Sequence, residues 1–149
     1  MQYTETIRIG LQRDRVAALF GDPANLPRWQ KGLLSFTHAE GPPGHPGATS
    51  HIVYQMGRRR IEMTETILVS DLPEHFAATY ETRGVWNRVD NRFRALPDGT
   101  TEWELESDFR CTGVLWLMAL LMPGMFRKQT AGMMADFKRF AENADAAAA

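Results

Sequence analysis

The chain has 149 residues, 44% of them hydrophobic, and a formal net charge of −1. This length predicts one domain, residues 1–149, that can bury a core, and the balanced charge argues against a nucleic-acid partner. The single cysteine, Cys111, excludes an internal disulfide and is typical of a reducing compartment. Because the polar N-terminus shows no signal peptide, we expect a cytoplasmic protein.

The N-terminal part of the chain predicts a strand followed by two short helices. Side chains alternate in character over residues 3–11, as in a half-buried strand. Asp14 offers an N-cap to a short helix that ends at Gly21–Pro23. A second helical turn, 24–31, carries Trp29, which we interpret as a core plug rather than as a gate to a cavity.

Six further strands are predicted next, joined by turns short enough for antiparallel hairpins. The Pro/Gly-rich stretch Gly41–Gly47 is longer, and we interpret it as a loop within the domain. The predicted strands cover residues 33–40, 49–56, 59–70, 75–83, 85–96 and 100–111.

The segment from Gly113 to Asn143 predicts a long helical region, interrupted at Pro123-Gly124. Its first part, Val114–Met122, is an unbroken apolar run that is too short to span a bilayer. After the interruption, apolar side chains recur at steps of three and four residues and form one helix face. The residues of this face are Phe126, Thr130, Met133, Phe137 and Phe140.

The same segment is rich in methionine, and the simplest interpretation is that these side chains belong to the core. A plastic pocket wall is the second interpretation, because methionine adapts to irregular apolar sites. The methionines concerned are Met118, Met122, Met125, Met133 and Met134. The alanine tail that follows Asp145 is expected to fray.

A strand, two small helices, a six-strand meander and a long helix make an α+β pattern. The predicted fold is a curved antiparallel sheet of about seven strands that wraps the C-terminal helix and encloses a cavity with it. Short turns allow the register to be predicted. In the last hairpin, Arg94 faces Glu102 on the outside and Phe93 faces Trp103 on the inside. This register leaves one like-charge mismatch, Asp90 opposite Glu106, unexplained.

The alternation of side chains between the two faces can be counted back from this hairpin, strand by strand, through the earlier turns. This count predicts a polar row across the inner, otherwise apolar face. It also places Phe76 opposite Val69. The row consists of Ser50, Glu65, Tyr80, Asn87 and Phe109, with the pair Asn91 and Ser107 close by. A buried carboxylate is costly unless it is paired or protonated, and a polar cluster in an apolar cavity can orient a ligand. The alternative is that these groups bond one another in a packed core, or lie at an open rim.

The remaining candidates carry weaker signals. No two of the four histidines share a metal-binding spacing on a helix and Cys111 has no C-x-x-C partner, so we expect no metal site. No nucleotide-binding loop is present, and we expect no cofactor. The triplet Arg58-Arg59-Arg60 at a hairpin tip is interpreted as a solvated turn, with contact to an anionic surface or ligand as the alternative.

The order of elements resembles the SRPBCC superfamily, the helix-grip group that includes START-related lipid-binding domains, polyketide cyclase/dehydrase-like proteins and pollen-allergen-like proteins. Nearly the whole chain takes part in this resemblance. The segments that carry it are the opening strand, residues 13–29, the loop 41–47, residues 65–73 and 97–103, and the start of the helical region at Gly113. The resemblance implies a cavity between sheet and helix that binds lipids, polyketides, sterols or other apolar molecules. It implies no particular catalytic residues.

Three hypotheses for function follow. The first is binding of a small hydrophobic or amphipathic molecule, with Glu65, Tyr80, Asn87 and Asn91 fixing its polar end. The expected apolar lining comprises Phe76, Phe93, Trp103, Phe109, Met133 and Phe137. The second is a cyclase or dehydratase in which Glu65 or Tyr80 acts as the general acid or base. The third is association with a membrane, a partner or a second copy of the chain through Val114–Met122.

Overall fold

A computed structural model describes the backbone of residues 1–148 and the side chains of residues 1–146. Within these residues, seven strands form one antiparallel sheet with the order β1-β7-β6-β5-β4-β3-β2. The strands are β1 (Gln2–Ile9), β2 (Leu33–Glu40), β3 (Thr49–Met56), β4 (Arg59–Asp71), β5 (His75–Thr82), β6 (Val85–Ala95) and β7 (Thr101–Cys111). The sequential order from β2 to β7 is the predicted meander, and β1 closes it by pairing with β7.

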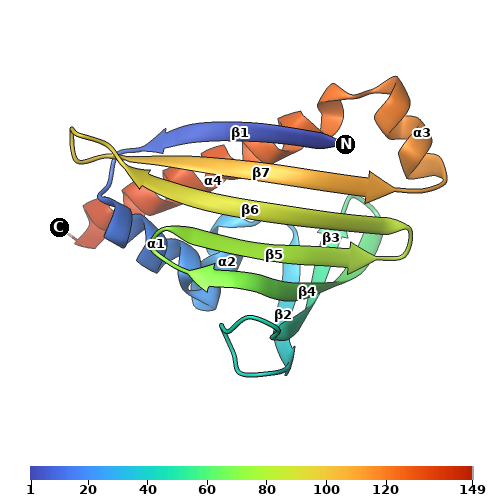
Figure 1. Cartoon of the computed structure of the whole chain (residues 1–149), viewed down its shortest axis with the longest axis horizontal. Coiled ribbons are helices and arrows are strands. Elements are labelled where there is room, and N and C mark those ends of the chain that lie inside the picture. The colour runs from blue at the N-terminus through green and yellow to red at the C-terminus, as the bar shows by residue number, and fades with distance from the viewer. Residues whose placement is uncertain (149) are drawn as a thin grey trace.

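Helices cover the inner face of this sheet, except α3 (Val114–Leu121), which stands beyond its end. The others are α1 (Arg13–Gly21), a short 3₁₀ turn η1 (Pro23–Asn25), α2 (Leu26–Trp29) and α4 (Gly124–Ala148). Figure 1 shows α4 crossing behind the sheet, with α1 and α2 at one end of the molecule and α3 at the other. The predicted α+β helix-grip fold is therefore confirmed.

Two helix ends differ from the sequence prediction. Gln12, not Asp14, occupies the N-cap of α1 without a side-chain hydrogen bond, and Asp14 lies in the first turn. α4 continues to Ala148, beyond the predicted end at Asn143. Alanine has the highest helix propensity, and Arg15 Nε lies 3.4 Å from Asp145 Oδ1, which ties the end of α4 to α1.

The predicted register is confirmed at most positions. Tyr80 pairs with both Glu65 and Asn87, so the polar row crosses the sheet as expected. The exception lies in β4, where a bulge separates Ile67 from Val69 and Phe76 pairs with Ser70 instead of Val69. A bulge inserts one unpaired residue, which a count through the turns does not reveal.

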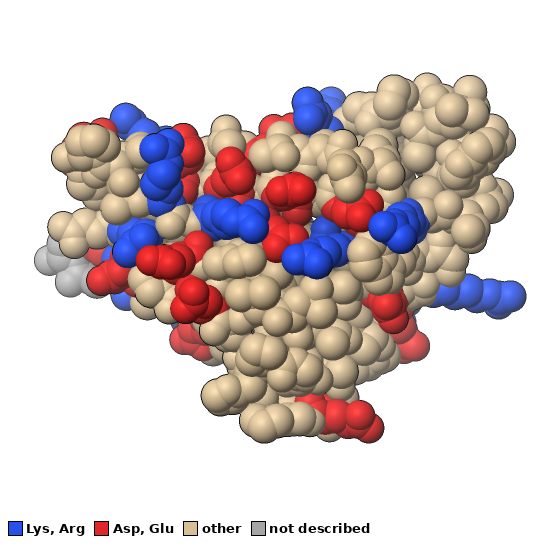
Figure 2. All heavy atoms as spheres, in the orientation of Figure 1, with Lys and Arg blue, Asp and Glu red and all other residues tan. Residues whose placement is uncertain are grey.

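The outer face of the sheet is charged. Figure 2 shows acidic and basic side chains intermingled across the face that looks toward the viewer. Arg94 Nη2 lies 2.9 Å from Glu102 Oε1, as the register predicts. Exposed pairs of this kind contribute up to about 1 kcal/mol each. Their main effect is to specify which face of each strand points to solvent, and their contribution to stability is small.

The like-charge mismatch of Asp90 and Glu106 is resolved by neighbours from two strands. Asp90 is buried, its Oδ1 lies 2.8 Å from His75 Nε2, and Arg88 Nε donates to its Oδ2 at 2.9 Å. Arg92 lies within 4.0 Å of both Asp90 and Glu106. Burial by itself would raise the pKa of Asp90, but the hydrogen bonds from Arg88 and His75 outweigh it and hold this pKa below its usual range.

We expect Asp90→Asn to lower the free energy of unfolding at pH 7 by about 1–3 kcal/mol, because hydrogen bonds to a buried charged group are lost. A lowered folded-state pKa stabilises the fold above the unfolded value of about 3.9. The difference between wild type and variant should therefore shrink as pH falls through 4. Urea unfolding at pH 7, 5 and 3 measures it. Glu106→Gln, across the same strand pair but half exposed, is the control and should change stability by less than about 1 kcal/mol.

Candidate ligand cavity

A cavity of about 520 Å³ lies between the inner face of the sheet and α4. This volume is within the range that small-molecule sites occupy, about 300–1,000 Å³. Most of its wall is apolar, with side chains that include Phe20, Met56, Met63, Val85, Val89, Leu105, Phe109, Phe126 and Met133. Tyr3, Tyr54, Tyr80, Asn87, Asn91, Ser107 and Thr130 are among its polar residues.

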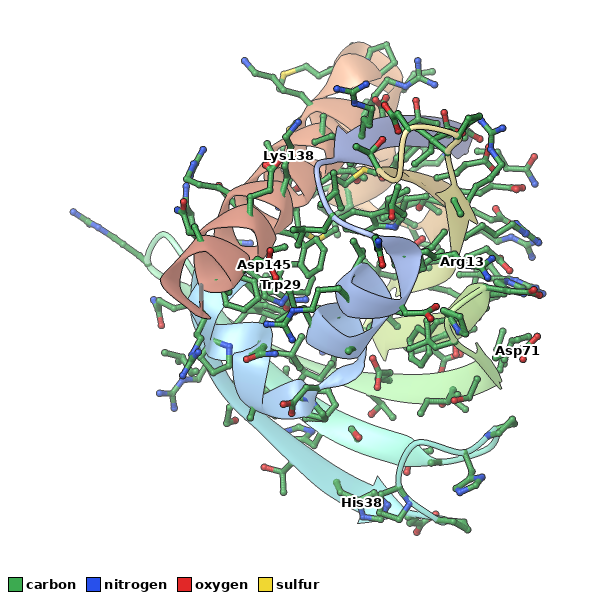
Figure 3. All side chains as sticks on the ribbon, turned by 90° about the vertical axis from the view of Figure 1, so that its left-hand side faces the viewer. Arg13, Trp29, His38, Asp71, Lys138 and Asp145 are labelled. Carbon is green, nitrogen blue, oxygen red and sulfur yellow. The ribbon has the colours of Figure 1, made fainter. Side chains whose placement is uncertain are left out.

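An aromatic cluster closes the end of the cavity near α1. Phe20 of α1 enters between sheet and helix, and its ring centroid lies 5.1 Å from that of Phe93, 5.6 Å from Trp103 and 5.8 Å from Phe137. Trp29 of α2 stands next to it, 5.0 Å from Phe137 by the same measure. Figure 3 shows Trp29 between α4 and the two small helices.

Trp29 is both a core residue and a cavity-lining residue. Its side chain is buried, yet the ring borders the cavity and also a second hollow of about 470 Å³ between α2 and α4. Among the residues whose side chains are described, Trp29 Nε1 is the one buried side-chain nitrogen or oxygen without a hydrogen-bond partner. Leaving a buried donor unpaired costs about 1–3 kcal/mol, so this N–H is available for an acceptor.

The polar row forms a second feature of the wall. Burial raises the pKa of the Glu65 carboxyl, and a hydrogen bond with Tyr80 opposes that effect. Burial, together with the nearby Glu65 charge, raises the pKa of Tyr80 well above its usual value and that of Tyr54 to about 12. The Tyr54 hydroxyl donates to Gln30 Oε1. Burial thus shifts the Glu65 equilibrium toward the protonated carboxyl, and the raised pKa values keep both tyrosine hydroxyls protonated.

Several inner polar groups bond one another. Trp103 Nε1 donates to Asn91 Oδ1 at 3.0 Å, and Ser107 Oγ donates to Asn87 Oδ1 at 2.8 Å. Asn91 Nδ2 donates to the Phe76 carbonyl at 3.3 Å. Asn87 and Asn91 thus have partners within the protein, as the alternative of a self-satisfied polar cluster anticipated.

The structure divides the predicted site residues into two groups. Six line the cavity: Tyr80, Asn87, Asn91, Trp103, Phe109 and Met133. Four lie outside its lining: Glu65, Phe76, Phe93 and Phe137. The three phenylalanines of the second group pack around the ring of Phe20. Glu65 lies beside Tyr80, whose ring faces the cavity.

Sequence reasoning missed Tyr54 and Phe20 as lining residues. Tyr54 shares the parity of Ser50 and Ile52 on β3, so the same register count could have placed it on the inner face. Phe20 carried no such signal, because the direction in which α1 packs is a tertiary property. Among the described residues, no group of three or more His, Cys, Asp or Glu side chains is arranged to hold a metal ion.

A curved antiparallel sheet that grips a long helix around a mainly apolar cavity defines a helix-grip protein. Residues 1–142 match the family described as polyketide cyclase / dehydrase and lipid transport. The chain belongs to this family.

Solved structures with the same fold include functionally different proteins. The aromatase/cyclase ZhuI from Streptomyces sp. R1128 superposes with a TM-score of 0.79 at 13% identity, covering 95% of this chain and 93% of that one. Ara h 8.0201 gives 0.77 at 12% identity, with 96% and 98% covered. Norcoclaurine synthase from Thalictrum flavum, in complex with dopamine and hydroxybenzaldehyde, gives 0.71 at 10% identity, with 96% and 87% covered. A comparison with curated proteins finds no match.

Proposed function

We propose that the protein binds a small amphipathic molecule, of lipid, polyketide or aromatic type, in the cavity between sheet and α4. The observation that carries this proposal is a 520 Å³ cavity with a mainly apolar wall and a few polar groups aimed into it. Such a wall removes apolar ligand surface from water, and its polar groups select orientation. The family description, which includes lipid transport, supports the same class of ligand.

Two sets of protein groups would recognise the polar parts of the ligand. Trp29 Nε1, which has no hydrogen-bond partner and is shielded from solvent, would donate a hydrogen bond to a carbonyl or hydroxyl oxygen once the ligand displaces the side chains that cover it. Tyr80, backed by Glu65, would contact a second polar group farther along the cavity.

Native mass spectrometry on protein purified from its own host, followed by extraction of bound molecules, tests this proposal. We expect a discrete co-purifying small molecule with an apolar body. Titration with the neutral fluorophore N-phenyl-1-naphthylamine provides a second readout that requires no natural ligand. A chain that arrives as a clean apo mass and also fails to bind this fluorophore would contradict the proposal.

A second candidate function is a cyclase- or dehydratase-type reaction in the same cavity. The observation that favours it is a buried carboxyl, Glu65, next to Tyr80, because burial raises the pKa of this carboxyl in the direction that a general acid requires. The fold similarity to an aromatase/cyclase is compatible with this candidate. Its weakness is that Glu65 stands behind Tyr80 rather than in the lining, so Tyr80 would have to transfer the proton.

Glu65→Gln separates the two candidates. If the cavity only binds, the isosteric amide should keep affinity for the extracted ligand within about threefold, whereas an acid catalyst would lose turnover by about 10²-fold or more. Because the pKa of Glu65 is raised in the folded state, stability of the wild type should fall as pH rises from about 4.3 through that raised pKa. The variant should lack this fall. Glu62→Gln, an exposed position on β4, is the matched control and should keep the wild-type pH profile.

A further inference from the structure

α3 presents apolar side chains to solvent on most of its circumference, and Leu115 and Ala119, one turn apart, are half-buried. Every residue from Val114 to Leu121 is apolar, and the structure buries none of them. Leu121 is 71% exposed, Leu120 63% and Trp116 57%. Met122, directly after the helix, is also exposed, so the interpretation of Met118 and Met122 as core residues is wrong. A contiguous exposed apolar patch of this kind marks an interaction surface.

The chain itself keeps α3 away from the core. Gly113 precedes α3 with a positive φ of 66°, and Pro123 separates it from α4. Proline lacks the N–H that a continuing helix needs, so α3 and α4 cannot merge into one rod packed on the sheet. α3 touches β7 and stands beyond the end of the sheet (Figure 1).

Basic side chains lie at the same end of the sheet as this apolar helix. The hairpins β3–β4 and β5–β6 and the end of β7 all lie at the same end of the sheet, as the pairings Met56–Arg59 and Thr82–Val85 require. The sequence between Arg110 and Arg127 carries no charged residue. In Figure 2 the uncharged surface at upper right corresponds to α3, and basic side chains project beside it.

Several of these cations have no acidic partner. Within the described side chains, no ion pair involves Arg58, Arg59 or Arg60 on the β3–β4 hairpin, Arg83 on the β5–β6 turn, or Lys128 at the start of α4. Exposed Glu62 and Glu81 lie next to the same hairpins, so the five unpaired cations leave an excess of positive charge at this end, whereas the net charge of the chain is −1. An apolar patch with unpaired cations at the same end of the molecule fits a surface that is apolar inside and negatively charged outside.

We propose that α3 docks on an anionic lipid bilayer, with its apolar side chains among the acyl chains and the nearby Arg and Lys side chains at the headgroups. An eight-residue helix is far too short to cross a bilayer, and no helix among the described residues can do so. It matches an interfacial element that lies in the boundary region. A second copy of the chain is a poorer occupant, because a symmetric contact through α3 would bring the same cations face to face.

This inference does not depend on the proposed function, but it places the cavity with respect to the bilayer. Met56, Thr82 and Val85 line the cavity at the same end of the sheet from which α3 projects. Docking would therefore turn that end of the cavity toward the lipid surface.

Co-sedimentation with vesicles tests the proposal directly. The wild type should bind vesicles of phosphatidylglycerol and phosphatidylcholine and should bind vesicles of phosphatidylcholine alone at least tenfold more weakly. Raising the salt from 0.1 to 0.5 M should weaken binding to the anionic vesicles, because screening shortens the reach of the cations. Quenching by brominated lipids should fall sharply in Trp116→Phe, since Trp116 is the indole on α3.

Matched variants identify the surface. Leu120→Asp combined with Leu121→Asp should reduce partitioning at least tenfold, whereas Leu34→Asp, at a leucine 49% exposed on β2, should leave it unchanged. Arg83→Glu with Lys128→Glu should reduce binding to anionic vesicles at least tenfold, and Arg13→Glu on α1 should not. Arg13 is half-buried and the other positions are exposed, and far-UV circular dichroism checks the fold.

Three results would overturn the proposal. One is a wild-type protein that does not bind anionic vesicles at 0.1 M salt. Another is a double aspartate variant that binds as well as the wild type. The third is a concentration-dependent dimer in analytical ultracentrifugation that this variant abolishes, without vesicle binding by the wild type, which would make a second copy the occupant.

Discussion

Phe137→Ala is expected to lower the free energy of unfolding by about 3–5 kcal/mol. Phe137 is fully buried on α4, and its ring contacts the rings of Phe20, Trp29 and Trp103. Removing it deletes a large apolar side chain and leaves a void where two small helices, the sheet and α4 meet. Aromatic pair geometry adds to the loss, since each edge-to-face pair contributes about 0.5–1.5 kcal/mol beyond its buried area.

Urea unfolding monitored by circular dichroism measures this effect. Phe140→Ala is the matched control, because Phe140 lies on the same helix, is only partly buried and makes a single ring contact, with Phe137. We expect the control to lose less than half as much stability. Equal losses for both variants would mean that the aromatic cluster is not the centre of the core.

Val89→Trp is expected to weaken binding of N-phenyl-1-naphthylamine at least tenfold, equivalent to about 1.4 kcal/mol, while leaving the protein folded. Val89 lies in the middle of β6 with its side chain on the cavity wall, between Ala78 on one neighbouring strand and Ser107 on the other. An indole at this position enters open volume rather than packed core, so the steric cost falls on the ligand rather than on the fold.

The control is Arg94→Trp, which adds the same indole to the outer face of the same strand. Arg94 is exposed and loses only a surface ion pair with Glu102. Fluorescence titration of both variants gives the comparison. If Val89→Trp binds the fluorophore with wild-type affinity, the fluorophore does not occupy this cavity.

Much of the sheet could be predicted because its rules are local. Side chains alternate along a strand, and turns of two to four residues fix how two strands align, so pairs such as Phe93 with Trp103 could be counted from the sequence. The inner position of Tyr80 and Asn87 follows from the same count. The helical period likewise predicted that Phe137 faces the sheet.

The register prediction failed where an extra residue shifts the alternation of side chains. It was also incomplete where side chains from more than two strands surround one charged group. The bulge between Ile67 and Val69 changed the partner of Phe76 and left no mark in the sequence. Within the β6–β7 pair alone, Asp90 faces the like charge of Glu106. Its partner His75 belongs to a third strand, β5, so the pair by itself does not show how the charge is compensated. The bulge lies inside the counted hairpin but adds a residue that alternation does not reveal, whereas the His75 contact lies outside the hairpin from which the Asp90 register was counted.

The sequence by itself determined the order of the six meander strands and the two faces of the sheet, because periodicity and short turns specify them. Its segments also resemble the family to which the chain belongs, but the pairing of β1 with β7 came from the structure. Only the tertiary structure decided which aromatic side chains surround a ligand volume and which form solid core. That division depends on Phe20, which α1 inserts among Phe76, Phe93 and Phe137, and the angle at which a helix leaves its strand is set by packing across the whole domain. The exposure of α3 was likewise decided by the tertiary structure, because an apolar segment has the same sequence pattern whether it is buried or exposed. The turn at Gly113 and the break at Pro123 direct this segment to solvent.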